Sequence, residues 1–177
     1  EELLLRCCLV SGVYESDAVP AITALDEELA RRGPGLTPQD SRAAAELLLA
    51  RAVVQWFAGD RAGAERDLQR AASRIGVPVP RARPAAITRS RILLVQAILR
   101  IADGSAAAAD ALLEAAIESA PYERFASCLF DDALDGVFGP LTVLDLIRRR
   151  LGPAIQLEFY SRLQLALRRG DGLLGVP

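Results

Sequence analysis

The feature that most constrains this chain is a pattern of seven apolar or small residues that recurs 45 positions further along. The first copy comprises Leu48, Ala52, Trp56, Gly59, Ala64, Leu68 and Ala71. The second copy comprises Leu93, Ala97, Ile101, Gly104, Ala109, Leu113 and Ala116. Spacings of three and four residues place such side chains on one face of a helix, and each glycine separates two helices. Each copy therefore predicts a helical hairpin, and because one hairpin cannot bury its own apolar face, the copies should stack.

The rest of the chain carries similar helical patterns and no long alternation of apolar and polar residues, so the expected fold is all-α. Nine helices are predicted, near residues 2–12, 17–32, 38–58, 61–75, 85–103, 106–119, 122–134, 140–151 and 154–169. Short loops favour antiparallel neighbours, with hairpins near 1–32, 38–75 and 85–120 and capping helices over 122–170. Residues 1–177 are thus predicted to form a single domain, a right-handed TPR-like stack of helix pairs.

Several predicted helix ends carry a recognisable cap. Thr37 precedes Pro38, an order that is typical of an N-cap followed by proline at the first helical position. Gly33 and Gly76 stand where left-handed C-caps belong. Gly170 is predicted to end the last helix after two arginines that complement the helix dipole.

The composition removes most catalytic chemistry. The chain has no histidine, so no Ser-His-Asp or Cys-His arrangement can form within it. Its three cysteines, Cys7, Cys8 and Cys128, show no metal-ligand spacing. All 21 basic residues are arginine, so the lysine of a phosphate-binding loop is absent as well. We therefore expect no enzyme activity, no cofactor and no metal within this chain.

The cysteines also bear on the compartment. Three cysteines, two of them adjacent, do not make a disulfide framework, and we expect reduced, buried thiols in a cytoplasmic protein. No apolar stretch is long enough to span a membrane, and no secretory signal pattern is present. The chain contains no methionine and begins with Glu1, which favours a fragment of a longer protein.

Charge is distributed in four blocks of alternating sign, although the net charge is only −2. Residues 1–67 carry −5, residues 68–102 carry +7, residues 103–145 carry −8 and residues 146–177 carry +4. Such blocks predict that neighbouring helices pair internally, basic against acidic. The alternative is a surface that binds an anion or a partner. It would involve the arginines of the second block, Arg81, Arg83, Arg89 and Arg91. That block lacks interleaved aromatic residues, so direct nucleic-acid binding is not expected.

Stacked repeats bind partners through the concave wall made by their first helices. The predicted wall residues are Leu49, Val53 and Trp56 in one copy and Leu94, Ile98 and Ile101 in the other. Polar side chains occupy equivalent places in the two copies, which predicts a groove for a polar effector. The candidate groove residues are Arg51, Gln55, Trp56, Gln96 and Arg100. The alternatives are that Trp56 is a core residue and that the polar side chains form a solvated face.

The two copies resemble tetratricopeptide (TPR) repeats. In that family the turn and second helix carry a glycine, an alanine five residues on, a large residue four further and an alanine three further. The matching residues here are Gly59, Ala64, Leu68 and Ala71, then Gly104, Ala109, Leu113 and Ala116. The match covers residues 40–121 well, is weak over 1–32 and is absent over 122–177. The period of 45 departs from the family's roughly 34 residues.

With this longer period, the chain is similar to the helical sensor region of MalT-like, LuxR-type bacterial transcription activators. In that family a nucleotide-binding domain precedes the repeats and a helix-turn-helix domain follows them. The resemblance implies an effector-sensing or protein-interaction domain in which repeat packing changes on binding. The implied partners are a regulatory protein, a small-molecule effector or a second copy of the chain. Two other functions stay open, a TPR-type scaffold or adaptor and an accessory helical domain of a larger enzyme.

Overall fold

The computed structural model describes residues 7–9, 11–13, 17–33, 37–75, 83–119 and 150–173. All of these residues are helical or lie in short connections, with no strand among them, so the all-α prediction is confirmed for this part of the chain. The helix predicted near 122–134, and most of the one near 140–151, lie outside the described residues. Within the same ranges, none of the helices combines the length and apolarity needed to cross a bilayer.

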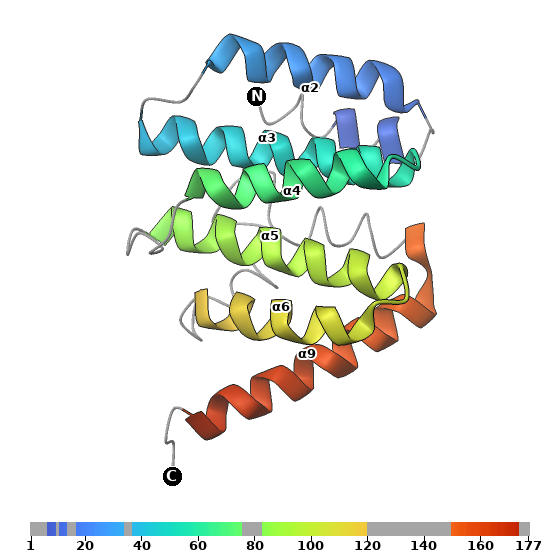
Figure 1. The fold of residues 1–177 in the computed structure, drawn as a ribbon, viewed down its shortest axis with the longest axis vertical. Coiled ribbons are helices and arrows are strands. Elements are labelled where there is room, and N and C mark those ends of the chain that lie inside the picture. Colours follow the sequence, from blue (N-terminus) through green and yellow to red (C-terminus); the bar gives the residue numbers. More distant parts are fainter. Residues whose placement is uncertain are drawn as a thin grey trace.

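Six helices form the described stack (Figure 1). They are α2 (Ala18–Arg32), α3 (Pro38–Phe57), α4 (Arg61–Ile75), α5 (Arg83–Ala102), α6 (Ala106–Ser119) and α9 (Pro153–Leu173). The first five begin and end within about two residues of the predicted positions, the precision expected of helix boundaries. In contrast, α9 runs through Gly170 to Leu173, so the prediction that Gly170 ends it is wrong. Glycine adopts helical dihedrals as readily as left-handed ones, and its presence alone does not stop a helix.

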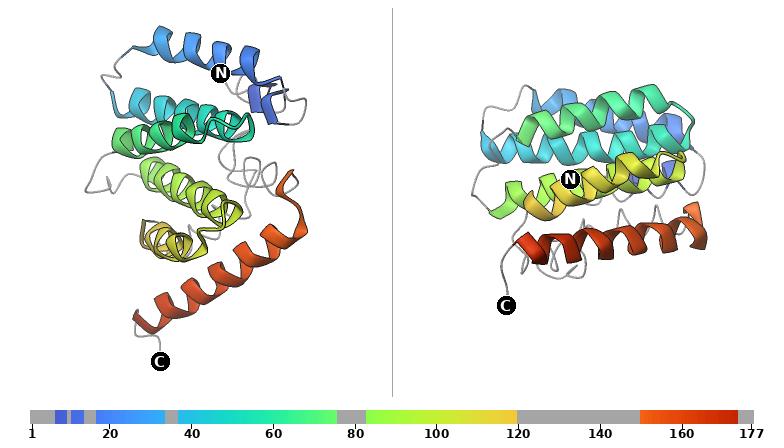
Figure 2. Two further views of the ribbon diagram at one scale, coloured as in Figure 1. Left: turned by 45° about the vertical axis from the view of Figure 1, so that its right-hand side comes forward. Right: turned by 60° about the horizontal axis from the view of Figure 1, so that its bottom comes forward.

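The helices pair into two antiparallel hairpins, α3 with α4 and α5 with α6, which lie one above the other (Figure 1). On the far side of α3 from the second hairpin lies α2, and the layered arrangement is clear in both views of Figure 2. Contacts within each hairpin are far more extensive than those between the hairpins. The stack therefore consists of two closely packed pairs joined by smaller contacts of α5 with α4 and with α3, and we call the contact of α4 with α5 the α4–α5 seam.

The helix α9 departs from this antiparallel order. It packs on both α5 and α6 and runs in the same direction as α6 (Figures 1 and 2). Two ion pairs fix that direction: Arg162 meets Asp110 at 2.8 Å, and further along both helices Arg169 meets Glu114 at 2.9 Å. As a result, α9 covers the second hairpin without forming an antiparallel pair with α6.

The turns of the two hairpins have the same geometry 45 residues apart. Gly59 and Gly104 have φ angles of 92° and 77°, values that favour glycine because it lacks Cβ. The Gly59 amide donates to the Trp56 carbonyl at 3.2 Å, and the Gly104 amide donates to the Ile101 carbonyl at 3.0 Å. In each turn the next amide donates to the carbonyl five residues back, at 2.9 and 2.8 Å, which completes a Schellman motif. The predicted role of these glycines is confirmed.

The residues predicted at the helix crossings are buried. Ala64 and Ala109 are almost fully inaccessible, and Leu68 and Leu113 lie in the same core. Alanine at a crossing lets two helix backbones approach closely, while leucine fills the space beside it. One continuous apolar core includes residues from all six helices, so the two hairpins share their buried surface.

The predicted N-cap of α3 is confirmed, whereas the predicted left-handed C-cap of α2 is confirmed only in its positive φ. The Thr37 hydroxyl oxygen accepts a hydrogen bond from the Asp40 amide at 3.1 Å, which confirms the N-cap of α3. Gly33 follows the last residue of α2 with a φ of 67°, although its ψ of −155° lies outside the left-handed helical region. Gly76 lies outside the described residues.

The prediction of buried cysteines is confirmed for Cys8 and wrong for Cys7. Cys8 lies in the core, whereas Cys7 is exposed, because adjacent residues of a helix point in different directions. Burial raises the pKa of the Cys8 thiol. Cys128 lies outside the described residues.

Truncating a leucine inside a hairpin should be costly. We expect Leu113→Ala to lower the free energy of unfolding by about 2–5 kcal/mol, because the neighbouring helices close only partly over the lost side chain. The control Val19→Ala removes an exposed side chain from α2 and should change stability by less than about 0.5 kcal/mol. Urea denaturation followed by circular dichroism measures both, and equal effects would contradict a core at Leu113.

The two adjacent thiols should react at different rates. In a Cys128→Ser variant, iodoacetamide should modify Cys7 much faster than Cys8, because Cys8 is buried and its raised pKa leaves less thiolate. Intact mass measured over time should show one fast equivalent and a second only after unfolding. A Cys7→Ser, Cys128→Ser control should stay unmodified while folded, and its rapid labelling would place Cys8 outside the core.

Candidate functional site

The five candidate groove residues do not form one groove. Arg51 and Gln55 lie on α3, and the Arg51 side chain reaches α2 and α4. Gln96 and Arg100 lie on α5 and line a small pocket against α4, which Trp56 at the end of α3 also lines. The structure thus brings Trp56, Gln96 and Arg100 together at the α4–α5 seam. It leaves Arg51 and Gln55 apart, the latter with its Oε1 atom buried and without a hydrogen-bond donor among the described residues.

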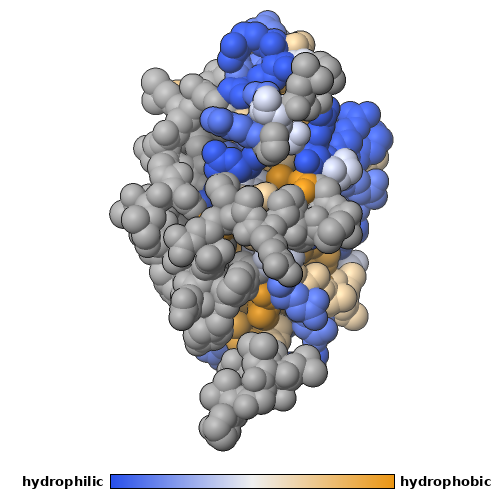
Figure 3. Space-filling model, turned by 90° about the vertical axis from the view of Figure 1, so that its left-hand side faces the viewer, coloured by the Kyte–Doolittle hydropathy of each residue, from blue (hydrophilic) through white to orange (hydrophobic). Residues whose placement is uncertain are grey.

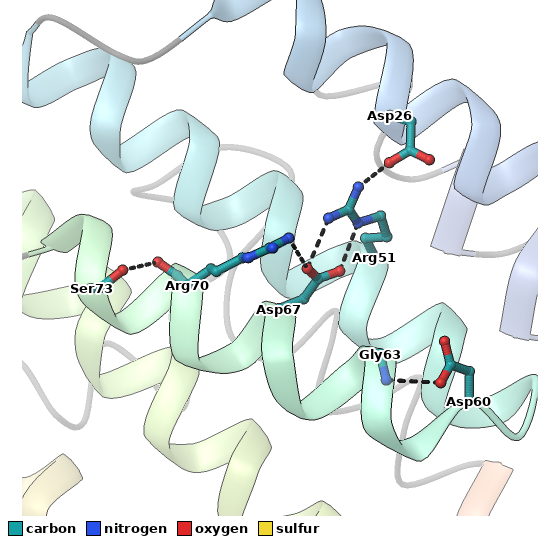
Figure 4. A network of polar contacts seen from close by, with 7 residues as sticks. All are labelled: Asp26, Arg51, Asp60, Gly63, Asp67, Arg70 and Ser73. Atoms are coloured by element: carbon teal, nitrogen blue, oxygen red, sulfur yellow. Dashed lines mark hydrogen bonds and ion pairs between the residues drawn. The ribbon is translucent and has the colours of Figure 1, made fainter.

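Arg51 is the centre of a charge network that joins three helices (Figure 4). Its Nε and Nη2 atoms donate to the two carboxylate oxygens of Asp67 on α4, at 2.6 and 2.8 Å. Its Nη1 atom donates to Asp26 on α2. The Asp67 side chain is only 3% exposed, and its hydrogen bonds raise the pKa of the Arg51 guanidinium. An effector could reach this guanidinium only by leaving a buried carboxylate unpaired, so the geometry supports a structural role for Arg51.

The α4–α5 seam is built around Trp56 and its charged neighbours. The Arg61 guanidinium lies over the Trp56 ring, 3.4 Å from the ring centroid. Asp103, in the turn after α5, accepts a hydrogen bond from Trp56 Nε1 at 3.3 Å and lies 3.4 Å from Arg61 Nε. These contacts tie the turn of the second hairpin to the turn of the first. Trp56 is buried, which agrees with the alternative that it is a core residue, and its ring also lines the seam.

A second polar contact lies across the same seam. Arg100 Nη2 donates to Glu65 Oε2 at 2.7 Å, with the two side chains 40% and 38% exposed. Gln96, one turn earlier on α5, lines the small pocket beside this pair, whose volume is about 60 Å³. A water molecule occupies about 30 Å³ of liquid, whereas pockets for small molecules run from about 300 Å³ upward. The pocket therefore has room for water but not for a metabolite.

The predicted concave wall is wrong. All six of its residues are buried, namely Leu49, Val53, Trp56, Leu94, Ile98 and Ile101. The reason is that the first helices lie inside the stack. Four helices surround α5, which contacts α3, α4, α6 and α9, while α3 contacts α2, α4 and α5. The residues identified as an apolar binding wall are therefore part of the core.

The charge blocks pair with one another, as predicted. Arg91 of the second block lies 3.8 Å from Glu46 of the first, and the Arg100–Glu65 pair joins the same two blocks. The third and fourth blocks meet in the α6–α9 ion pairs. Arg91 is buried and therefore cannot belong to the exposed basic surface that the alternative requires. The Arg81 and Arg83 side chains lie outside the described part of the chain, and Arg89 is half-buried.

The sequence analysis missed the residues that complete these contacts, above all Asp67, Arg61 and Asp103. Asp67 carried the clearest indication, because it is a lone acid on the buried face that also holds Ala64 and Leu68. A carboxylate in that position requires a buried cationic partner. A pocket of about 180 Å³ between α6 and α9 was also not predicted, and its charged lining residues pair across it.

The described residues contain no cluster of three or more side chains that could hold a metal ion. In comparisons with known proteins, no family model, curated protein or solved structure matches this chain. Function is therefore inferred from the geometry of the stack.

Removing Arg51 should destabilise the fold more than removing an exposed arginine. Arg51→Ala leaves the buried Asp67 carboxylate with only the exposed Arg70, 3.7 Å away, and we expect a loss of about 3 kcal/mol in the free energy of unfolding. Arg100→Ala, the control, breaks a half-exposed pair and should cost less than about 1 kcal/mol. Urea denaturation of both variants gives the comparison.

A double variant distinguishes the unpaired charge from lost packing. Arg51→Met combined with Asp67→Leu should recover most of the stability that Arg51→Ala loses, because no buried charge is then left unpaired. Losses of equal size for Arg51→Ala and Arg100→Ala would show that the Arg51–Asp67 pair is not buried in solution.

Proposed function

We propose that this chain is a non-catalytic, TPR-like helical-repeat domain that senses an effector through a change in packing between its two hairpins. The observation that supports it is the contrast between closely packed hairpins and the smaller α4–α5 seam that joins them. In stacked repeats, stability divides into terms within each unit and terms at each interface. A ligand at the seam can therefore shift one hairpin against the other while each stays folded.

The volume of the seam pocket supports a coupling between binding and packing. A metabolite does not fit in about 60 Å³, so it could enter only by separating Arg100 from Glu65 and widening the seam. Breaking a half-exposed ion pair costs less than about 1 kcal/mol. A ligand that binds only the widened arrangement shifts the population toward it, which is the thermodynamic requirement for a sensor.

The sequence resemblance supplies the setting for this proposal. In a MalT-like, LuxR-type bacterial transcription regulator, a change in repeat packing would be passed to neighbouring nucleotide-binding or DNA-binding domains. The second candidate is a TPR-type adaptor that binds a protein on a preformed surface. The small size of the seam pocket favours the adaptor function if the partner is a protein, because a protein binds on a surface and needs no enclosed cavity.

The single tryptophan makes the proposal measurable. We would screen nucleotides and anionic metabolites by thermal shift, and a true effector should also change the fluorescence of Trp56, because its ring lines the seam. Once separated from Glu65, the Arg100 guanidinium is free to pair with an anionic effector, so Arg100→Ala should weaken binding by about tenfold or more, equivalent to about 1.4 kcal/mol. The matched control is Arg66→Ala, an exposed arginine on α4 outside the pocket, which should leave binding unchanged.

Two outcomes would count against seam sensing. A compound that binds wild type and Arg100→Ala equally, and leaves Trp56 fluorescence unchanged, binds elsewhere. A complete absence of binders in the panel would move support to the adaptor function.

A further inference from the structure

The outer face of α4 carries a row of exposed arginines. Arg66, Arg70 and Arg74 follow one another at four-residue intervals, and all three are exposed. Residues four apart lie on the same side of a helix, with a rise of about 6 Å from one to the next. None of the exposed residues of α4 is acidic. We call these three residues the α4 arginine row.

Two arginines of the row keep their hydrogen-bond donors available. Among the described residues, the Arg66 side chain takes part in no ion pair and no hydrogen bond. Arg70 is 64% exposed and lies 3.7 Å from Asp67, too far for a hydrogen bond. The Asp67 carboxylate is already engaged by Arg51, at 2.6 and 2.8 Å (Figure 4). Arg66 and Arg70 therefore present positive charge and donors that a ligand can use.

The surroundings of the row are polar. Between the arginines, the exposed residues Gln69 and Ser73 carry no charge and no large apolar group. The described surface in the view of Figure 3 is likewise mainly hydrophilic, with smaller hydrophobic areas. Binding along the row therefore depends on charge rather than on the burial of apolar side chains.

Nearby acids limit the shape of an anionic partner. Glu65, next to Arg66 in the sequence, is half-exposed and pairs across the seam. The helix α6 lies on the same side of α3 and α5 as α4 does (Figures 1 and 2), and it carries Asp110, Glu114 and Glu118. A broad anionic surface, such as a membrane or a duplex nucleic acid, would meet these acids as well as the row. A narrow segment that runs along α4 would not.

The contact of α6 with α9 shows how such a row can be recognised. Asp110 and Glu114 are four residues apart on α6. They pair with two arginines of the helix that lies alongside, Arg162 and Arg169, at 2.8 and 2.9 Å. A segment whose carboxylates are about 6 Å apart would match the spacing of the α4 arginine row and pair with it in the same way.

We propose that the α4 arginine row is a docking surface for an acidic peptide segment of a partner protein, whose carboxylates pair with Arg66 and Arg70. Exposed ion pairs are individually weak and are screened by salt, so the contact is transient and sensitive to ionic strength. Neither arginine lines the pocket at the α4–α5 seam. The inference therefore does not depend on the proposed sensing function, and a negative result for one leaves the other standing.

Fluorescence anisotropy with the full chain tests the docking. The probe is a fluorescein-labelled peptide of four Glu-Ala-Ala-Ala units, and its control has glutamine in place of each glutamate. At about 0.01 M salt, where the Debye length is about 30 Å, the glutamate peptide should bind and the glutamine peptide should not. At about 0.15 M salt the Debye length falls to about 8 Å, and binding should weaken by about tenfold or more.

Charge reversal locates the site. Arg66→Glu should weaken binding of the glutamate peptide by about tenfold or more, and because the Arg66 side chain makes no polar contact, circular dichroism should show an unchanged fold. Arg70→Gln removes a charge without placing an acid beside Asp67, and it should also weaken binding. The matched control is Arg168→Glu, the same change of charge at an exposed site on α9, which should leave binding unchanged.

Three results would overturn the proposal. The first is an absence of binding of the glutamate peptide at low salt. The second is an equal loss of binding in Arg66→Glu and Arg168→Glu, which would mean that only net charge matters. The third is a short duplex DNA, or vesicles of phosphatidylglycerol, that bind more tightly than the peptide and are released by Arg66→Glu. That result would assign the row to a broad polyanion.

Discussion

The burial of the small side chains Ala64 and Ala109 in the shared core is the constraint on which the rest of the stack depends. A larger side chain at either crossing would hold the two backbones apart and open the contact around the neighbouring leucine. The Arg51–Asp67 pair needs the same spacing, because a bidentate ion pair tolerates only small changes in distance. The apolar contact thus sets the distance at which the buried charges between α3 and α4 can meet.

The contacts inside each hairpin differ in chemistry from the contacts between the two hairpins. Inside a hairpin the interface is apolar and closely packed, and its one buried acid, Asp67, is fully engaged. Between hairpins the edge of the interface is polar and half-exposed, with Arg100, Glu65 and Asp103 accessible to water. Exposed ion pairs contribute little to stability and rearrange at low cost. In the proposed sensing function, the hairpins are the units that persist and the seam is the place where they would move.

Local features of the fold were predictable from the sequence because each is fixed by residues close in the chain. The turns at Gly59 and Gly104 and the N-cap at Thr37 depend on spacing within a few residues. Features that depend on contacts between distant segments of the chain were not predictable from the sequence. Whether Val53 faces a partner or a neighbouring helix is set by the number of helices around α3, which periodicity does not encode. The direction of α9 depends on which acids meet Arg162 and Arg169, and the sequence alone offers several candidates.

The turns of the two hairpins share their glycine and two of their hydrogen bonds, 45 residues apart, so the chain repeats one structural unit. A duplicated segment of 45 residues inserted between α4 and α5 would need the contacts that now join the two hairpins, Arg100 with Glu65 and Trp56 with Asp103, on both of its sides. The α9 helix would still pack against α5 and α6, which the insertion leaves unchanged. Because the energy of such a solenoid is close to a sum over nearest neighbours, each added module would lengthen the rod and contribute its own increment of folding free energy.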